Sequence, residues 1–241
     1  MKLSHMKPLL REEYVPITHQ MGFLEGDFET VVQSYLKWRR TLQPALSFEY
    51  FVADLPSALS RLDPLTTPWD KELLISTDSG WIAFFCNGLR SCDPESPVGH
   101  LCTIIPCRGV VVHSVPDRSD VKDPRALRIY GAVSFTLFAP HETDWLNQER
   151  HISAMNDGGE WVFHQQGKRQ PFEYPERYEV RKISDRFTPE MLEDYCAALG
   201  IRLFAEDFYG GNALLAQIPN QLATGSPVMS LQEAKKYTLI R

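Results

Sequence analysis

Hydrophobic residues recur with two different periods along this chain. Between Asp27 and Arg40 they fall three or four residues apart, which is the period of one face of a helix. Asp27 is suited to cap the start of this helix, and the basic residues near its end suit the negative end of the helix dipole. We therefore predict an amphipathic helix of about four turns, whose charged face we interpret as solvated scaffold.

The middle of the chain has the pattern of strands. The apolar runs Glu72–Ile75 and Trp81–Asn87 are separated by a turn-rich segment, Ser76–Gly80, and together they predict a hairpin. The second run is apolar on both faces, so we expect a central strand that is covered on both sides. Further strands are predicted at Leu46–Val52, at Gly109–Val115, within Arg125–Phe138, at Tyr178–Ile183 and at Ile201–Ala205.

A second hairpin is predicted over Arg150–His164, because Asn156–Gly159 supplies residues that tolerate positive φ. Thr188, Pro189 and Gly200 have the chemistry of an N-cap, a first helical residue and a left-handed stop, and they delimit another helix. Ser230 and Glu233 have capping-box spacing for a final helix over Leu231–Tyr237. Short helices are predicted around Pro56–Leu62 and Pro97–Ile105.

Helices therefore flank a mostly β middle and do not alternate with strands. This order favours an α+β fold with a mostly antiparallel or mixed sheet flanked by a few helices. A length of 241 residues suits one domain of this class. We find no convincing linker, so we predict a single α+β domain over residues 1–241.

Charge and hydropathy exclude some classes of partner. The 31 acidic residues outnumber the 25 basic ones, which gives a net charge of −6 and disfavours nucleic-acid binding. No apolar stretch is long enough to span a membrane, so no membrane partner is expected. The start of the chain lacks the apolar core of a secretory signal, and we expect a cytoplasmic location.

Cysteine chemistry gives the best candidates for a metal or a nucleophile. Cys86, Cys92, His100, Cys102 and Cys107 lie close in sequence, but their spacing is not that of a zinc ribbon or knuckle. Simple burial is the more ordinary interpretation, so we predict free thiols, no metal and no cofactor.

An enzyme is the alternative function. Strong catalytic motifs are absent from the sequence. Cys92 follows Arg90 in a predicted loop, where a positive charge would favour a thiolate. A hydrolase using this cysteine or a loop carboxylate therefore stays open, although no spacing ties a histidine to Cys92.

Three segments carry a resemblance to known proteins. They are Thr77–Trp81, Asn156–Phe163 and the stretch from Asp185 through Glu190 to Tyr209. The chain resembles poorly characterised bacterial proteins of similar length that are similar to immunity proteins encoded beside polymorphic toxins. The resemblance implies a protein partner, a cognate toxin domain that is neutralised by occlusion. The acidic balance would suit a basic toxin surface.

Two loops are predicted to hold the binding residues. The Asn156–Trp161 turn and the Glu206–Tyr209 loop both combine acids, aromatics and glycines next to predicted strands. The candidate binding residues are Asp157, Glu160, Trp161, Glu206, Asp207 and Tyr209. Trp69, Trp145 and Trp161 also lie near polar loop residues, where an exposed aromatic would anchor an interface, although core packing is more common for any one of them.

Overall fold

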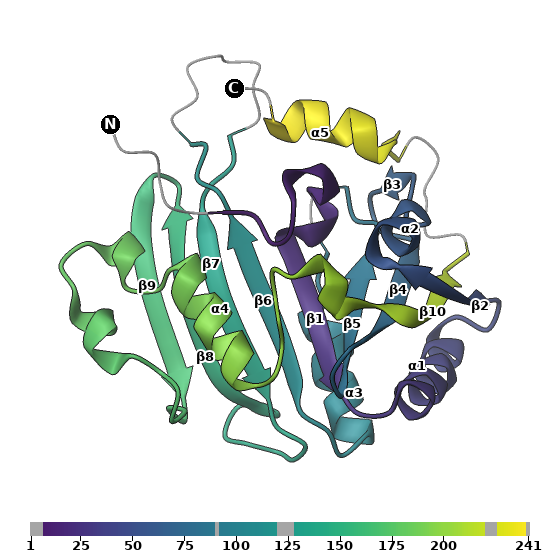
Figure 1. Ribbon diagram of the computed structural model, residues 1–241, viewed down its shortest axis with the longest axis horizontal. Helices are drawn as coiled ribbons and strands as arrows, with labels where there is room; N and C mark the ends of the chain where they lie inside the picture. Colours follow the sequence, from purple (N-terminus) through teal and green to yellow (C-terminus); the bar gives the residue numbers. More distant parts are fainter. Residues whose placement is uncertain (1–6, 90–91, 120–127, 220–225, 240–241) are drawn as a thin grey trace.

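One large antiparallel sheet forms the centre of the protein. The computed structural model describes residues 7–89, 92–119, 128–219 and 226–239. Nine strands pair in the order β2-β10-β4-β5-β1-β6-β7-β8-β9, and every pairing between them is antiparallel. Helices lie on both faces of this sheet (Figure 1). The α+β class with a mostly antiparallel sheet is thereby confirmed.

The strands of the sheet come from most of the length of the chain. A separate pair, β3 with β11, joins residues from distant parts of the sequence. The strands are β1 Gln20–Glu25, β2 Ser47–Asp54, β3 Leu65–Thr66, β4 Lys71–Thr77, β5 Trp81–Cys86, β6 Gly109–Val115, β7 Ala132–Phe138, β8 Gln148–Asp157, β9 Glu160–Gly167, β10 Tyr209–Gln217 and β11 Val228–Met229. The α-helices are α1 Phe28–Leu42, α2 Leu55–Ser60, α3 Glu95–Ile104, α4 Pro189–Ala198 and α5 Leu231–Leu239.

Each face of the sheet supports its own hydrophobic core. On one face α2, α4 and the N-terminal segment pack over sheet side chains such as Phe85 and Phe135, and Tyr195 of α4 belongs to this core. On the other face α1 and α3 pack over Leu24, Phe84 and neighbouring side chains. This second cover reaches the strands from β5 to β7.

Two glycines allow α3 to lie close to the sheet. A Cβ atom at Gly22 would stand 2.7 Å from Val98 Cγ2, and one at Gly109 would stand 2.6 Å from Cys102 Sγ. A larger residue at either of these two positions would therefore push the helix outward. The close contact places α3 directly against β1 and β6.

Most of the capping predictions are confirmed. The Asp27 side chain accepts a hydrogen bond from Thr30 N at 3.0 Å, and α1 follows at once. Ser230 N donates to Glu233 Oε2 at 2.9 Å, as a capping box requires. Both predicted hairpins form, as β4–β5 and β8–β9.

Two predicted strands are wrong. The segment Tyr178–Ile183 lies instead in and between two short 3₁₀ turns, Pro175–Glu179 and Ile183–Asp185. Ile201–Ala205 also forms no strand. Ile201 and Leu203 are buried in the first core, and the backbone hydrogen bonds of this segment are those of turns. The next strand begins only at Tyr209.

The Arg125–Phe138 prediction is confirmed in its second half. Strand β7 begins at Ala132, with Phe135 and Leu137 facing one core and Thr136 facing the other side of the sheet. Residues 125–127 lie outside the described residues.

Candidate functional site

The predicted β8–β9 turn has the expected geometry but not the expected aromatic anchor. Gly158 and Gly159 have φ values of 63° and 115°, which the turn requires. Asp157 and Glu160 are paired across the turn and exposed. Trp161 is partly buried and packs against the first core. The turn therefore offers two acids to a partner and little free aromatic surface.

The predicted loop before β10 is engaged within the chain. Glu206 forms an ion pair with Arg11, and Asp207 Oδ1 lies 3.3 Å from Arg202 Nη1. Tyr209 is 2% exposed, and its hydroxyl donates to the carbonyl oxygen of Leu203 at 2.7 Å. The tyrosine is a core residue, so it does not supply contact area at the surface.

The structure does not bring these two loops together through the sheet. Strands β4, β5, β1, β6 and β7 lie between β10 and β8. In Figure 1 the β8–β9 turn lies at the upper left of the sheet, whereas β10 lies at the right. The six predicted residues are therefore divided between two places.

A third loop carries the exposed aromatic surface. The segment 139–147 joins β7 to β8 at the lower end of the sheet in Figure 1. Trp145 is 54% exposed and Leu146 is 78% exposed, whereas Trp69 is held by a hydrogen bond to Glu72 at 3.2 Å. Sequence reasoning noted Trp145 among three tryptophans, but no sequence signal distinguished it from the other two.

Hydrogen bonds constrain the backbone of this loop. Ala139 N donates to Asn147 O at 2.8 Å, and Thr143 N donates to Leu146 O at 2.7 Å. The Asn147 side chain donates to Gly99 O in α3 at 2.8 Å, which ties the loop to the helix. Leu146 has a φ of 54°, a left-handed backbone conformation that is unfavourable for a residue with a branched side chain. These hydrogen bonds constrain the backbone that carries Trp145 and Leu146.

A hollow lies on each side of Trp145. One, of about 380 Å³, is lined by residues that include His141, Asp144, Glu149 and Lys168. The other, of about 460 Å³, lies between the loop and the start of α3 and is lined by residues that include Glu95 and His100. Trp145 and Gln148 line both hollows, so the tryptophan forms the ridge between them.

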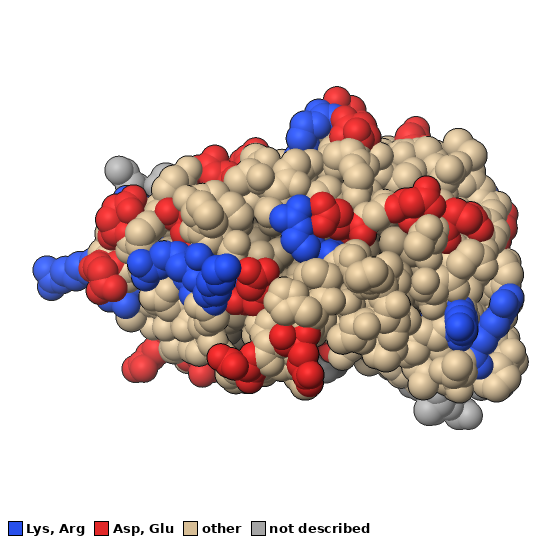
Figure 2. Space-filling model, turned by 90° about the horizontal axis from the view of Figure 1, so that it is seen from below, with Lys and Arg blue, Asp and Glu red and all other residues tan. Residues whose placement is uncertain are grey.

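Acidic side chains outnumber lysine and arginine in the lining of the two hollows. Asp144, Glu149 and Glu95 line the hollows, and the basic residue among the lining side chains is Lys168. Figure 2 views the molecule from this lower end and shows acidic and basic side chains interspersed over it. The surface is suited to a partner with an apolar recess and basic surroundings.

A polar network lies on the sheet behind the second hollow. Thr136 Oγ1 donates to Glu95 Oε1 at 3.0 Å and lies 2.9 Å from His151 Nδ1. Because this hydroxyl has one proton, Nδ1 of the neutral histidine donates to it. Nε2 is then free to accept from Ser153 Oγ, which lies 3.2 Å away.

Burial shifts the pKa of both titratable groups in this network. Burial, with the charges of His164 and Arg150, lowers the pKa of His151 to about 4, while burial raises the pKa of Glu95. Both shifts favour the neutral forms. Ser153 is only 1% exposed, so its hydroxyl does not face a substrate in solvent.

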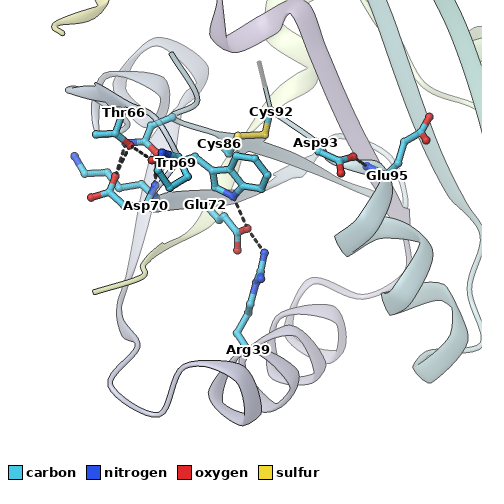
Figure 3. The surroundings of a disulfide bond; sticks show 12 residues. Arg39, Thr66, Trp69, Asp70, Glu72, Cys86, Cys92, Asp93 and Glu95 are labelled. Atoms are coloured by element: carbon cyan, nitrogen blue, oxygen red, sulfur yellow. Dashed lines mark hydrogen bonds and ion pairs between the residues drawn. A yellow bond between two sulfur atoms is a disulfide. The ribbon is translucent and has the colours of Figure 1, made fainter. Parts of the chain in front are cut away.

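The cysteine chemistry differs from the sequence prediction. Cys86 and Cys92 form a disulfide bond and are not free thiols, as Figure 3 shows. The two cysteines are six residues apart in sequence, and their Cα atoms lie 5.7 Å apart, which is within the usual range for a disulfide. The apolar sequence around Cys86 did not indicate this pairing. In this disulfide-bonded form Cys92 has no free thiolate to act as a nucleophile.

The remaining cysteines are buried. Cys102, Cys107 and Cys196 carry free thiols, and burial raises the pKa of Cys196 above its usual value. Within the described part of the chain, no group of three or more histidine, cysteine or acidic side chains is arranged to hold a metal ion.

Comparison with known proteins adds no relative. No protein family, curated protein or solved structure matches the chain. Among the described helices, none is long and apolar enough to cross a membrane. Function must therefore be argued from the site itself.

Proposed function

We propose that this chain is a cytoplasmic protein-binding protein that neutralises a bacterial toxin by occluding it, with the 139–147 loop as its recognition surface. The toxin part of this proposal comes from the sequence resemblance. The location of the surface comes from the exposure of Trp145 and Leu146 on a hydrogen-bonded loop.

The exposure of Trp145 and Leu146 on the hydrogen-bonded 139–147 loop is the observation that supports a binding function. An exposed tryptophan is a frequent source of binding energy, and a rigid backbone lowers the entropy lost on association. Leu146 is almost four-fifths exposed, although burying such a side chain is favourable by about 1.5–3 kcal/mol. A partner that covers both side chains would regain this energy.

The acidic rim favours a basic partner. Asp144 and Glu149 stand beside the tryptophan, where they would speed the approach of a positively charged toxin domain. Nucleic acid is a poor candidate for the same surface, since its phosphates would meet these carboxylates.

Co-expression with the products of the adjacent genes tests the proposal. We expect one of these products to stop growth when it is expressed alone, and to be neutralised when this chain is present. The double change Trp145→Ala and Leu146→Ala is expected to raise the Kd of the purified complex by about 100-fold or more. If no adjacent product is toxic, or if none binds this chain, the proposed function is wrong.

Charge reversal separates this surface from the two loops predicted from sequence. Asp157→Lys with Glu160→Lys alters the β8–β9 turn, and Asp144→Lys with Glu149→Lys alters the rim of the Trp145 ridge. We expect the second pair to slow association strongly in low salt and the first pair to have a small effect. The opposite result would place the interface at the β8–β9 turn.

A further inference from the structure

The sheet ends at β2 in a long strand with one free edge. Strand β2 pairs with β10 on one side, and no other described strand pairs with its second side. Its eight residues contain no proline and no lysine, and its register with β10 is unbroken over the whole strand. Such a long and regular edge has neither the proline nor the lysine that often prevents pairing with another strand.

One face of this edge strand is apolar and exposed. Phe48, Tyr50 and Val52 are 38%, 42% and 77% exposed, and they alternate along the strand on the same face. The rings of Phe48 and Tyr50 lie 5.8 Å apart in an edge-to-face arrangement. The free backbone edge and the apolar row together form a surface that fits another strand.

The sequence of β2 is complementary to itself in one antiparallel register. If Tyr50 lies opposite Tyr50 of a second copy, then Phe48 lies opposite Val52 and Glu49 lies opposite Phe51. Apolar residues then meet apolar residues along the exposed row, and like charges are not placed directly opposite each other. A two-fold axis through Tyr50 satisfies both copies at once.

The charges on the other face favour the same register. Arg61 lies over the ring of Phe51, with 3.9 Å from its guanidinium to the ring centroid, and its Nη1 is 2.8 Å from Glu49 Oε2. In the Tyr50-centred pair, Glu49 of the second copy comes opposite Phe51 and therefore next to Arg61. In the symmetric dimer each Arg61 would lie between Glu49 of its own chain and Glu49 of the second copy.

We propose that this protein forms a two-fold dimer in which the β2 strands of two copies pair antiparallel about Tyr50 and join their sheets into one. The occupant of the edge is a second copy because the strand complements itself in side-chain size and in charge. The proposal is independent of the toxin hypothesis, since the 139–147 loop lies between β7 and β8, near the other end of the sheet.

Sedimentation of the purified full chain tests this proposal. We expect the average mass to rise from monomer to dimer as the protein concentration increases from about 1 µM to about 1 mM. Tyr50→Lys places two ammonium groups at the two-fold axis and is expected to raise the dimer Kd by about tenfold or more. The matched control is Val162→Lys, a similarly exposed apolar position on β9, at the opposite edge of the sheet, which should leave the Kd unchanged.

A charge exchange identifies the register. Glu49→Arg and Arg61→Glu should each weaken self-association, because each places like charges across the axis. An equimolar mixture of the two single variants should form a heterodimer, since each new charge then meets its opposite. Circular dichroism confirms that each variant is folded.

Three results would overturn the proposal. They are a folded wild-type protein that stays monomeric throughout this range, a dimer that is weakened by Val162→Lys but not by Tyr50→Lys, and a mixture that does not associate better than the single variants.

Discussion

The buried ion pair of Arg150 with Glu173 connects β8 to the segment that follows β9. Arg150 Nε and Nη2 donate to the two carboxylate oxygens at 2.9 and 2.7 Å, and both side chains are at most 3% exposed. Tyr178 adds a hydrogen bond to the same carboxylate at 2.9 Å. The geometry is the two-pronged form that makes an arginine pair strong and directional.

Glu173→Ala is expected to lower the free energy of unfolding by about 3–5 kcal/mol, because it leaves the Arg150 charge buried without its partner. Urea denaturation monitored by circular dichroism measures the change. Glu176→Ala, at an exposed position in the next turn, serves as the control and should cost less than about 0.5 kcal/mol. A loss below about 1 kcal/mol for Glu173→Ala would show that the pair does not hold this segment.

Two histidines at the centre of the sheet, His19 just before β1 and His113 in β6, predict a dependence of stability on pH. Burial lowers the pKa of His19 to about 3 and that of His113 to about 4, both below the value of about 6.5 expected in the unfolded chain. The unfolded state therefore binds more protons between these values. The contribution of these two histidines to the free energy of unfolding is fully present above about pH 6.5. It falls as the pH drops towards 4, by at most about 1.4 kcal/mol per pH unit for each histidine.

Urea denaturation at pH 7, 6 and 5 tests this dependence. The double variant His19→Gln and His113→Gln should have a shallower fall than the wild type. His141→Gln, at an exposed position of the β7–β8 loop, should not alter the slope. An identical slope in the double variant would assign the acid sensitivity to other groups.

At the scale of elements, the packing of α3 on the sheet depends on the missing side chains of Gly22 and Gly109. Gly109→Ala would place a methyl group 2.6 Å from both Cys102 Sγ and Val98 Cγ1. We expect a loss of about 1–3 kcal/mol in the free energy of unfolding, because the packed helix must move. Gly80→Ala is the control, since a Cβ there meets no atom within 4 Å. Equal stability of the two variants would show that α3 shifts freely.

At the scale of the whole molecule, the two proposed surfaces lie far apart along the sheet. The β2 edge begins the strand order, whereas the Trp145 loop joins its seventh and eighth members. We therefore expect Tyr50→Lys to retain partner binding at the wild-type Kd for each chain, and Trp145→Ala to retain the dimer. Titration calorimetry and sedimentation measure the two properties separately. A variant that lost both would indicate a single shared surface or misfolding.

The sequence by itself determined the elements whose signals are local. Asp27, Thr188 and the Ser230–Glu233 pair each mark a helix start, because a cap needs only its own first turn. Both hairpins follow from turn residues between apolar runs, and the unbroken apolar run of β5 indicated a strand covered on both faces. The α+β class followed from the order of these elements.

Tertiary structure decided what depends on distant contacts. Ile201 and Leu203 have an alternating pattern, yet they pack against other elements and find no strand to pair with, while Tyr209–Gln217 forms a strand because β2 and β4 flank it. The Cys86–Cys92 bond, the burial of Tyr209 and the exposure of Trp145 are likewise invisible in the chain alone. A side chain of one type serves a core or an interface equally well, and only the neighbours brought by folding select between them.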